Sequence, residues 1–302
     1  MKDNFQPIKL ANLCGWFGVG RQAYYKQNWA VETIAKQEDM VLQEVAIIRK
    51  KHCKIGTRKL YTMLQPFIKE HAIKMGRDAL FTTLSSNNLL VRKRKRRIQT
   101  TQSYHRFHKY PNLIRDFIPT AINQLWVSDI TYWKLEEKYV YISFITDAYS
   151  RKIVGYHVAD TLAAVECLQA LKMAFSALRA ESHFQLIHHS DRGVQYCCNQ
   201  YVKLLQQHHV TISMTENGDP LENAIAERLN GIIKDEYLEN YEVVTIKEAK
   251  AVLKKAVDLY NKERPHMSLG NLTPNQIHVS KNTPKPEKLW KNYYQKSSTI
   301  VT

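Results

Sequence analysis

Residues 125–158 read LWVSDITYWKLEEKYVYISFITDAYSRKIVGYHV, and this stretch decides the fold of the chain. Trp, Tyr, Val and Ile dominate three runs, at 125–133, 138–147 and 153–158, which only short polar or charged breaks separate. Such residues favour strands, and short breaks between strand-forming runs are typical of hairpins. The stretch therefore predicts three consecutive strands linked by hairpins.

The residues after this stretch alternate between helical and strand patterns. Helices are expected over 162–179 and 199–208 and from about residue 222 onward, and strands over 184–189 and 210–214. Three hairpin strands followed by alternating units predict an α/β fold, a mixed five-stranded sheet flanked by helices. This element order resembles that of the ribonuclease-H-like fold.

The first 119 residues predict helices instead. Residues 7–29 indicate two short helices around Gly18-Val19-Gly20, for which DNA contact and local packing are both open interpretations. Residues 39–90 indicate three helices, the second opening at Thr57 and the third covering 77–84. Short helices around tight turns are what a helix-turn-helix DNA-binding domain needs.

Charge is distributed unevenly along the 302 residues, whose formal net charge is +16. Residues 1–119 hold 23 Lys and Arg against 8 Asp and Glu, whereas residues 120–302 hold 21 against 20. A basic front part and a nearly neutral back part indicate a DNA-holding region joined to a region of different chemistry. The candidate DNA contacts of the front part are Arg58, Lys59, Arg92, Lys93, Arg94, Lys95, Arg96 and Arg97.

The six consecutive cations at 92–97 can be a solvated linker or a polyanion-binding segment. Because adjacent like charges repel one another, we favour neutralisation by nucleic acid. Such contacts position a protein on DNA without reading its sequence.

Several other classes of protein are disfavoured. The longest strongly apolar run, at about 139–145, is far shorter than the roughly 20 residues that span a bilayer, and the first residues lack the apolar core of a secretory signal. The five cysteines form no C-x-x-C pair, and the spacing around His188 and His189 matches no common zinc site. We expect a cytoplasmic protein without a membrane partner.

Three carboxylates occupy unusual positions. Asp129 lies inside the first predicted strand, where aspartate is depleted, and Asp191 follows the fourth strand at its carboxyl end. Glu227 shares a polar helical stripe with Asn223, Asn230 and Lys234. Each has an ordinary interpretation as a cap, a turn residue or an ion-pair partner, but the first strand, fourth strand and last helix converge at one edge of this fold.

Four ordered motifs give the chain a specific resemblance. They are WVSDITY at 126–132, HSDRGVQY at 189–196, ENAIAERLNGIIKDE at 222–236, and YNKERPH at 260–266 with LG at 269–270 and TP at 273–274. With 35 residues between Asp191 and Glu227, the chain resembles a DDE transposase with a retroviral-integrase-like catalytic core, most closely the OrfB type of the IS-three insertion-sequence family.

The resemblance implies a function and a set of partners. Asp129, Asp191 and Glu227 would hold two magnesium ions, for which manganese can substitute, and catalyse strand cleavage and strand transfer at insertion-sequence ends. Lys234 would contact a phosphate near the cut end. The implied partners are double-stranded DNA (the terminal inverted repeats of the element and the target), further copies of the chain assembled on DNA, and an upstream OrfA product, all at the bacterial nucleoid.

Two alternative functions stay open at this point. A ribonuclease-H-like nuclease that cuts without joining would use the same carboxylates, because the same metal ions activate water or a hydroxyl. A domesticated DNA-binding regulator would have no use for the triad.

The motifs and the composition divide the chain into five segments. We expect an N-terminal helical segment at 1–36, a helix-turn-helix domain at 37–97, a basic linker at 98–119, an integrase catalytic core at 120–280 and a C-terminal tail at 281–302.

Overall fold

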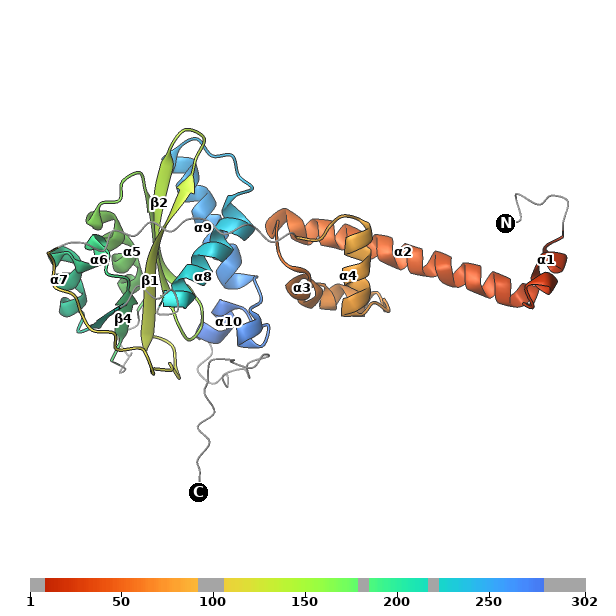
Figure 1. Ribbon diagram of the computed structural model, residues 1–302, viewed down its shortest axis with the longest axis horizontal. Helices are drawn as coiled ribbons and strands as arrows, with labels where there is room; N and C mark the ends of the chain where they lie inside the picture. Colours follow the sequence, from red (N-terminus) through yellow and green to blue (C-terminus); the bar gives the residue numbers. More distant parts are fainter. Residues whose placement is uncertain (1–8, 92–105, 179–184, 217–222, 280–302) are drawn as a thin grey trace, which may run out of the picture. The chain divides into compact units, whose positions relative to one another are not determined.

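The computed structural model describes residues 9–91, 106–178, 185–216 and 223–279. The chain divides into two compact units (Figure 1). The helical unit comprises Met1–Lys50 and Leu60–Leu90, and the sheet unit comprises Lys51–Lys59 and Val91–Thr302. We describe each unit by itself.

The helical unit is built from α1 (Leu10–Trp16), α2 (Arg21–Lys51), α3 (Thr57–Glu70) and α4 (Arg77–Ser86). Apolar side chains spaced three or four residues apart form its core, and the fully buried ones are Val41, Val45, Leu60, Leu64, Leu80 and Leu84. The predicted start at Thr57 and the predicted helix over 77–84 agree with α3 and α4. No described helix has the length and apolar character needed to cross a membrane.

The prediction of two short helices over residues 7–29 is wrong in its second half. Gly18, with a φ of 66°, does end the first helix, but α2 then continues as one helix from Arg21 to Lys51. No glycine or proline lies between these two residues, so nothing in the sequence terminates the helix. The expected segment boundary at residue 36 therefore falls inside α2.

The sheet unit contains the five predicted strands. They are β1 (Leu125–Lys134), β2 (Tyr139–Asp147), β3 (Ile153–Ala159), β4 (Ile187–Ser190) and β5 (Thr211–Met214), in the order β3-β2-β1-β4-β5. The hairpin strands pair antiparallel, while β1, β4 and β5 run parallel. The mixed sheet confirms the ribonuclease-H-like prediction.

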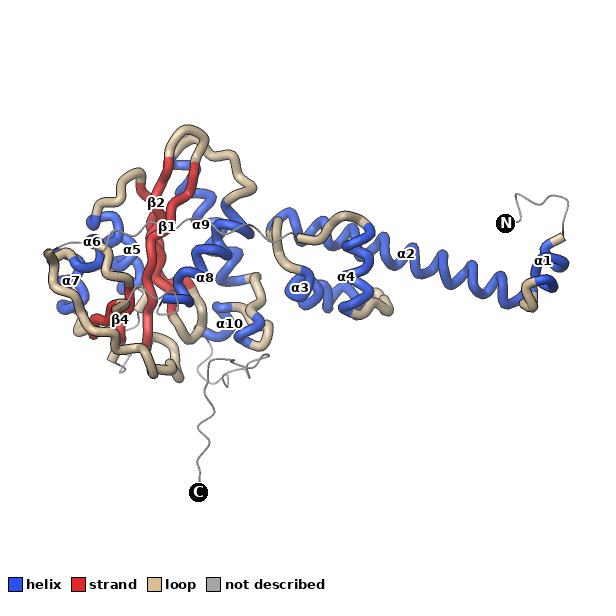
Figure 2. Tube along the Cα trace, viewed as in Figure 1, coloured by secondary structure: helices blue, strands red, loops and turns tan. Residues whose placement is uncertain are grey.

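Helices cover both faces of this sheet (Figures 1 and 2). One core packs α5 (Ala164–Ser176), α6 (Val194–Cys197) and α7 (Asn199–Gln207) against it. The other packs α8 (Ala224–Ile232), the π-helical segment η3 (Ile233–Leu238) and α9 (Ile246–Lys262), and the short helices η4 (Met267–Leu269) and α10 (Pro274–Val279) follow α9. Because α8 packs beside β1, the last predicted helix does reach the central strand.

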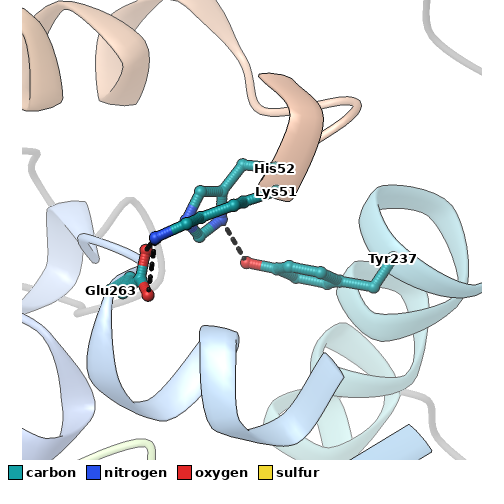
Figure 3. Close-up of polar contacts among 4 residues, drawn as sticks. All are labelled: Lys51, His52, Tyr237 and Glu263. Atoms are coloured by element: carbon teal, nitrogen blue, oxygen red, sulfur yellow. Dashed lines mark hydrogen bonds and ion pairs between the residues drawn. The ribbon is translucent and has the colours of Figure 1, made fainter. Parts of the chain in front are cut away.

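The segment before α3 belongs to the sheet unit (Figure 3). Buried His52 has its Nδ1 atom 3.0 Å from the Tyr237 hydroxyl of η3. Lys51 Nζ lies 3.3 Å from Glu263 Oε2, just beyond the end of α9. These contacts hold Lys51 and His52 against η3 and the residue that follows α9.

A glycine allows α5 to approach the sheet closely. A Cβ atom on Gly155 of β3 would overlap the carbonyl oxygen of Ala170 in α5 and would lie 3.0 Å from the Ala174 side chain. Gly231, inside α8, has nothing within 4 Å of the corresponding position. The two glycines therefore form a matched pair for testing the packing of this layer.

We expect Gly155→Ala to lower the free energy of unfolding by on the order of 2 kcal/mol, because the added methyl group must push α5 off β3. Gly231→Ala should leave it unchanged or raise it by up to about 1 kcal/mol, because alanine favours a helix interior. Chemical denaturation of both variants measures the two changes. A Gly155→Ala variant as stable as the unmodified chain would contradict this packing.

Candidate active site

Asp129 lies in the middle of β1, between strands β2 and β4. Its Oδ1 atom accepts a hydrogen bond from the N–H of Ile130 at 2.9 Å, and its Oδ2 atom accepts one from Asn230 Nδ2 at 2.7 Å. The side chain is partly buried. Both carboxylate oxygens are thus oriented by neutral donors.

Asp191 follows the last residue of β4 and comes beside Asp129. The parallel register pairs Val127 of β1 with His189 of β4, so two further residues along each strand bring the two aspartates level. Adjacent strands are about 4.8 Å apart. The N–H of Gly193 donates to Asp191 Oδ1 at 3.0 Å and turns the chain directly after the strand.

Glu227 comes from α8, which two asparagine side chains hold along β1. Asn223 Nδ2 donates to the carbonyl oxygen of Ser128 at 3.0 Å, and Asn230 Nδ2 donates to Asp129. Since these asparagines are seven residues apart, about two helical turns, they align the helix with the strand. Glu227 lies between them in the sequence and is partly exposed. The sequence predicts the polar stripe that contains all three but not the bonds to β1.

The three carboxylates influence one another. Burial, followed by the charge of Asp191 and to a smaller extent that of Glu227, raises the pKa of Asp129 to about 8, although the hydrogen bonds from Ile130 and Asn230 act in the opposite direction. Burial also raises the pKa of Glu227. The main influences on the pKa of Asp129 thus come from burial, two acidic groups and two neutral donors rather than from a cation.

The donor set fits a divalent cation. Within the described ranges, no three His, Cys, Asp or Glu side chains are close enough to form a complete metal-binding group. Three carboxylates nevertheless supply the hard oxygen donors that Mg²⁺ prefers, and this ion keeps several water ligands rather than requiring an all-protein cage. Their mutual repulsion opposes closer approach until a cation offsets it.

Two other buried polar residues near these strand ends have structural roles. Asp147 accepts three hydrogen bonds of 2.7 Å, two from Ser150 in the turn between β2 and β3 and one from the N–H of Asn123 before β1. His188 Nε2 lies 2.7 Å from the Ser128 hydroxyl and 3.0 Å from that of Tyr201. Burial, followed by the charge of His189, lowers the pKa of His188 to about 3, so this imidazole is neutral.

The candidate DNA contacts of the front part lie in different surroundings. Arg92–Arg97 fall outside the described residues. Arg58 is exposed, as a phosphate contact requires. Lys59, the next residue, is only 16% exposed, and its Nζ atom lies 3.7 Å from Glu236 Oε1 within the sheet unit. Lys59 is therefore engaged in an internal ion pair.

Lys234 lies one helical turn beyond Asn230, in η3. Its Nζ atom is 4.1 Å from the centre of the Tyr132 ring, a cation–π contact. Aromatic residues in a strand-forming run are expected in the core, and Trp126 and Trp133 on the same strand are buried, whereas Tyr132 is only partly buried. Lys234 of η3 thus contacts Tyr132, a partly exposed residue of the strand that also contains Asp129.

Comparison with known proteins identifies the class. Two family models described as Integrase core domain match residues 119–220 and 208–274. The chain is 36% identical over 269 residues to the insertion element IS600 31 kDa protein of Shigella sonnei, covering 87% of this chain and 96% of that one. It is 28% identical to the transposase for insertion sequence element IS629 of Shigella sonnei, covering 80% and 79%. The fold and the matched core define a DDE polynucleotidyl transferase.

The chain belongs to the insertion-sequence transposases of this class, whose integrase core depends on a divalent metal. Among solved structures it resembles the HTLV-2 integrase catalytic core domain in complex with magnesium, at 21% identity and a TM-score of 0.42, covering 52% of this chain and 97% of that one. The family assignment depends on the sequence relatives and the family models.

We expect Asp129→Asn to stabilise the metal-free protein above neutral pH. A carboxyl group whose pKa is raised to about 8 keeps its proton in the folded state after the unfolded chain has lost it, so the free energy of unfolding falls as pH rises from about 4 to 8. Asparagine removes this penalty, which this rise in the pKa makes on the order of 5 kcal/mol at pH 8.

Thermal unfolding across this pH range, with and without Mg²⁺, measures the effect. Mg²⁺ should raise the Tm of the unmodified chain far more than that of Asp129→Asn. Asp160→Asn, at an exposed carboxylate, is the control and should retain both the pH dependence and the response to Mg²⁺. The same pH profile and Mg²⁺ response in Asp129→Asn as in the unmodified chain would contradict the coupling.

Proposed function

We propose that this transposase cleaves and joins DNA strands at the ends of its insertion sequence with Asp129, Asp191 and Glu227 as the catalytic carboxylates. The observation that carries the proposal is the electrostatic coupling of three carboxylates that come from β1, the end of β4 and α8. The 35-residue interval between Asp191 and Glu227 supports the same assignment.

The triad would hold two magnesium ions, with manganese as a substitute. When bound, such ions activate a water molecule or a 3′-hydroxyl and stabilise the leaving oxygen of an in-line displacement. The residues of the chain orient the donors: Ile130 and Asn230 fix the two oxygens of Asp129, and Gly193 fixes one oxygen of Asp191. Glu227 is partly exposed, which leaves room for DNA on its side.

The DNA partners would be the terminal inverted repeats and the target duplex. We assign sequence-independent binding of the DNA backbone to Arg92–Arg97 and Arg58. A phosphate contact near the cut end is assigned to Lys234. The internal pairing of Lys59 with Glu236 makes that lysine the weakest of the proposed contacts. Assembly of several copies on DNA, an OrfA partner and a place in the bacterial cytoplasm at the nucleoid complete the proposal.

We expect alanine at Asp129, Asp191 or Glu227 to reduce strand cleavage and strand transfer by at least about 1,000-fold, because each change removes a metal ligand. Affinity for DNA should change little, since the proposed phosphate contacts are made by cations elsewhere in the chain. Transfer of a labelled 3′ end from an element-end duplex into a plasmid measures the activity.

The exposed carboxylates Asp160 and Glu242, each changed to alanine, are the controls and should retain activity. Full activity in any triad variant would refute the assignment. Cleaved ends without joined products from the unmodified chain would favour the nuclease alternative.

Changing Arg92–Arg97 to glutamine should weaken binding to any duplex and flatten its dependence on salt. If all six cations contact phosphates, the slope of log K against log[salt] should fall in magnitude by about 5. Fluorescence anisotropy over a salt series measures the slope. Glutamine at Lys247, Lys250 and Lys254, three exposed cations of α9, is the control and should change it far less per charge.

A further inference from the structure

A cationic cavity lies on the side of α8 away from the carboxylates. It has a volume of about 310 Å³, within the range of small-ligand sites. The side chains that α8 contributes to it are Ala224, Ile225, Arg228, Leu229 and Ile232. On a helical projection these positions lie opposite Asn223 and Asn230, which face β1. The cavity is therefore separate from the site that contains Glu227.

Four cations from separate parts of the chain line this cavity: Lys59, Arg151, Arg228 and Arg264. Burial and the charges of all four hold the pKa of His266, another lining residue, well below its ordinary value. The four cations are thus gathered around one point, although they are distant from one another in the sequence.

One carboxylate partly offsets this charge. Glu236 accepts two hydrogen bonds of 2.7 Å from Arg264, whose remaining nitrogen, Nη1, lies 3.0 Å from His266 Nε2. Burial works against the ionised form of Glu236, but the bonds from Arg264 and the nearby cations outweigh it and lower the pKa of this carboxyl. Arg264 and Glu236 therefore form a hydrogen-bonded ion pair in which the two charges offset each other.

The other cations keep an excess of positive charge. Burial, followed by repulsion from Arg264, lowers the pKa of Lys59 to about 8 despite its ion pair with Glu236. Asp147 attracts Arg151, but its two oxygens already accept three hydrogen bonds, from Asn123 and Ser150. A cluster of this kind is costly unless an anion joins it.

Two residues that line the cavity each have a buried donor with no hydrogen-bond partner among the described residues. The atoms are Thr146 Oγ1 and Arg151 Nη1. Leaving such a group unpaired costs about 1–3 kcal/mol, and more when it is charged. Arg151 also has a φ of 63°, unusual for a residue with a side chain, and the Tyr260 hydroxyl donates to its carbonyl oxygen at 3.0 Å.

We propose that this cavity binds a phosphate group, held by Arg151, Arg228 and the Thr146 hydroxyl, with Lys59 adding charge. Guanidinium groups match phosphate oxygens in geometry, and a tetrahedral anion can accept bonds from donors that converge from β2, the β2–β3 turn and α8. The group belongs either to the DNA backbone or to a small phosphate. Because no triad residue takes part, the proposal is independent of the proposed function.

Calorimetric titration of the full chain with inorganic phosphate, against chloride of equal ionic strength, tests the site. Arg228→Glu should raise the Kd for phosphate by more than about tenfold, because it replaces a guanidinium by a repelling carboxylate. Thr146→Val should raise it about threefold or more. Without phosphate, Thr146→Val should be at least as stable as the unmodified chain, since an unpaired buried hydroxyl is removed.

Lys172→Glu, at an exposed cation on α5, is the control and should leave phosphate binding unchanged. Heat released by phosphate that equals that of chloride would overturn the proposal. Phosphate binding that persists undiminished in both Arg228→Glu and Thr146→Val would overturn it as well.

A DNA arm separates the two sources of the phosphate. Thr146 is buried, so DNA can reach it only through the cavity. If a backbone phosphate is the ligand, Thr146→Val should weaken duplex binding about threefold, and inorganic phosphate should displace DNA more strongly than chloride does. If Thr146→Val binds the duplex as tightly as the unmodified chain but has lost phosphate binding, the ligand is a small phosphate.

Discussion

The buried carboxyl group of Asp129 in the central strand is the constraint around which the active-site edge of the sheet unit is organised. A carboxylate at such a position requires compensation, yet within the described part of the chain its hydrogen bonds come from the neutral donors of Ile130 and Asn230. The protein then adds two more carboxylates, Asp191 and Glu227, within electrostatic reach. Neutral dipoles orient the oxygens without cancelling a negative charge, which leaves the pKa of Asp129 raised and favours a bound cation beside its ionised form. In the proposed function, this position in β1 is a physical reason for metal binding at Asp129.

The parts of this arrangement that the sequence predicts are those with a local signature. Alternating β-branched and aromatic residues define β1 to β3, and a carboxylate inside such a run is conspicuous at Asp129. The motifs and the 35-residue interval add Asp191 and Glu227. The course of α2 was predicted wrongly because its apolar spacing becomes regular only near Val41, while Trp29 and other apolar side chains before it are exposed. Where no side chains are buried, apolar residues need not recur every three or four positions, so the sequence does not indicate a continuous helix.

The remainder depends on contacts between distant residues. Arg58 and Lys59 are adjacent and look alike in the sequence, but about 100° of helical rotation exposes the first and directs the second to Glu236. Likewise Arg151 and Arg228, 77 positions apart, look like ordinary surface cations until β2, β3 and α8 bring them to one cavity. No periodicity or motif in a single sequence contains that information, because it arises only when the layers pack.

Helix α8 keeps the two charged sites apart. Asn223 and Asn230 fix one side of the helix to β1, where Glu227 joins the acidic group, and Arg228 lines the cavity on the other side. Consecutive helical residues point about 100° apart, so the side chains of Glu227 and Arg228 do not face each other. The asparagine contacts with β1 keep this orientation of the helix. The near balance of acids and bases over residues 120–302 therefore does not mean local neutrality. We infer that each side of α8 keeps its own charge, which the proposed metal ions would offset on one side and the proposed phosphate on the other.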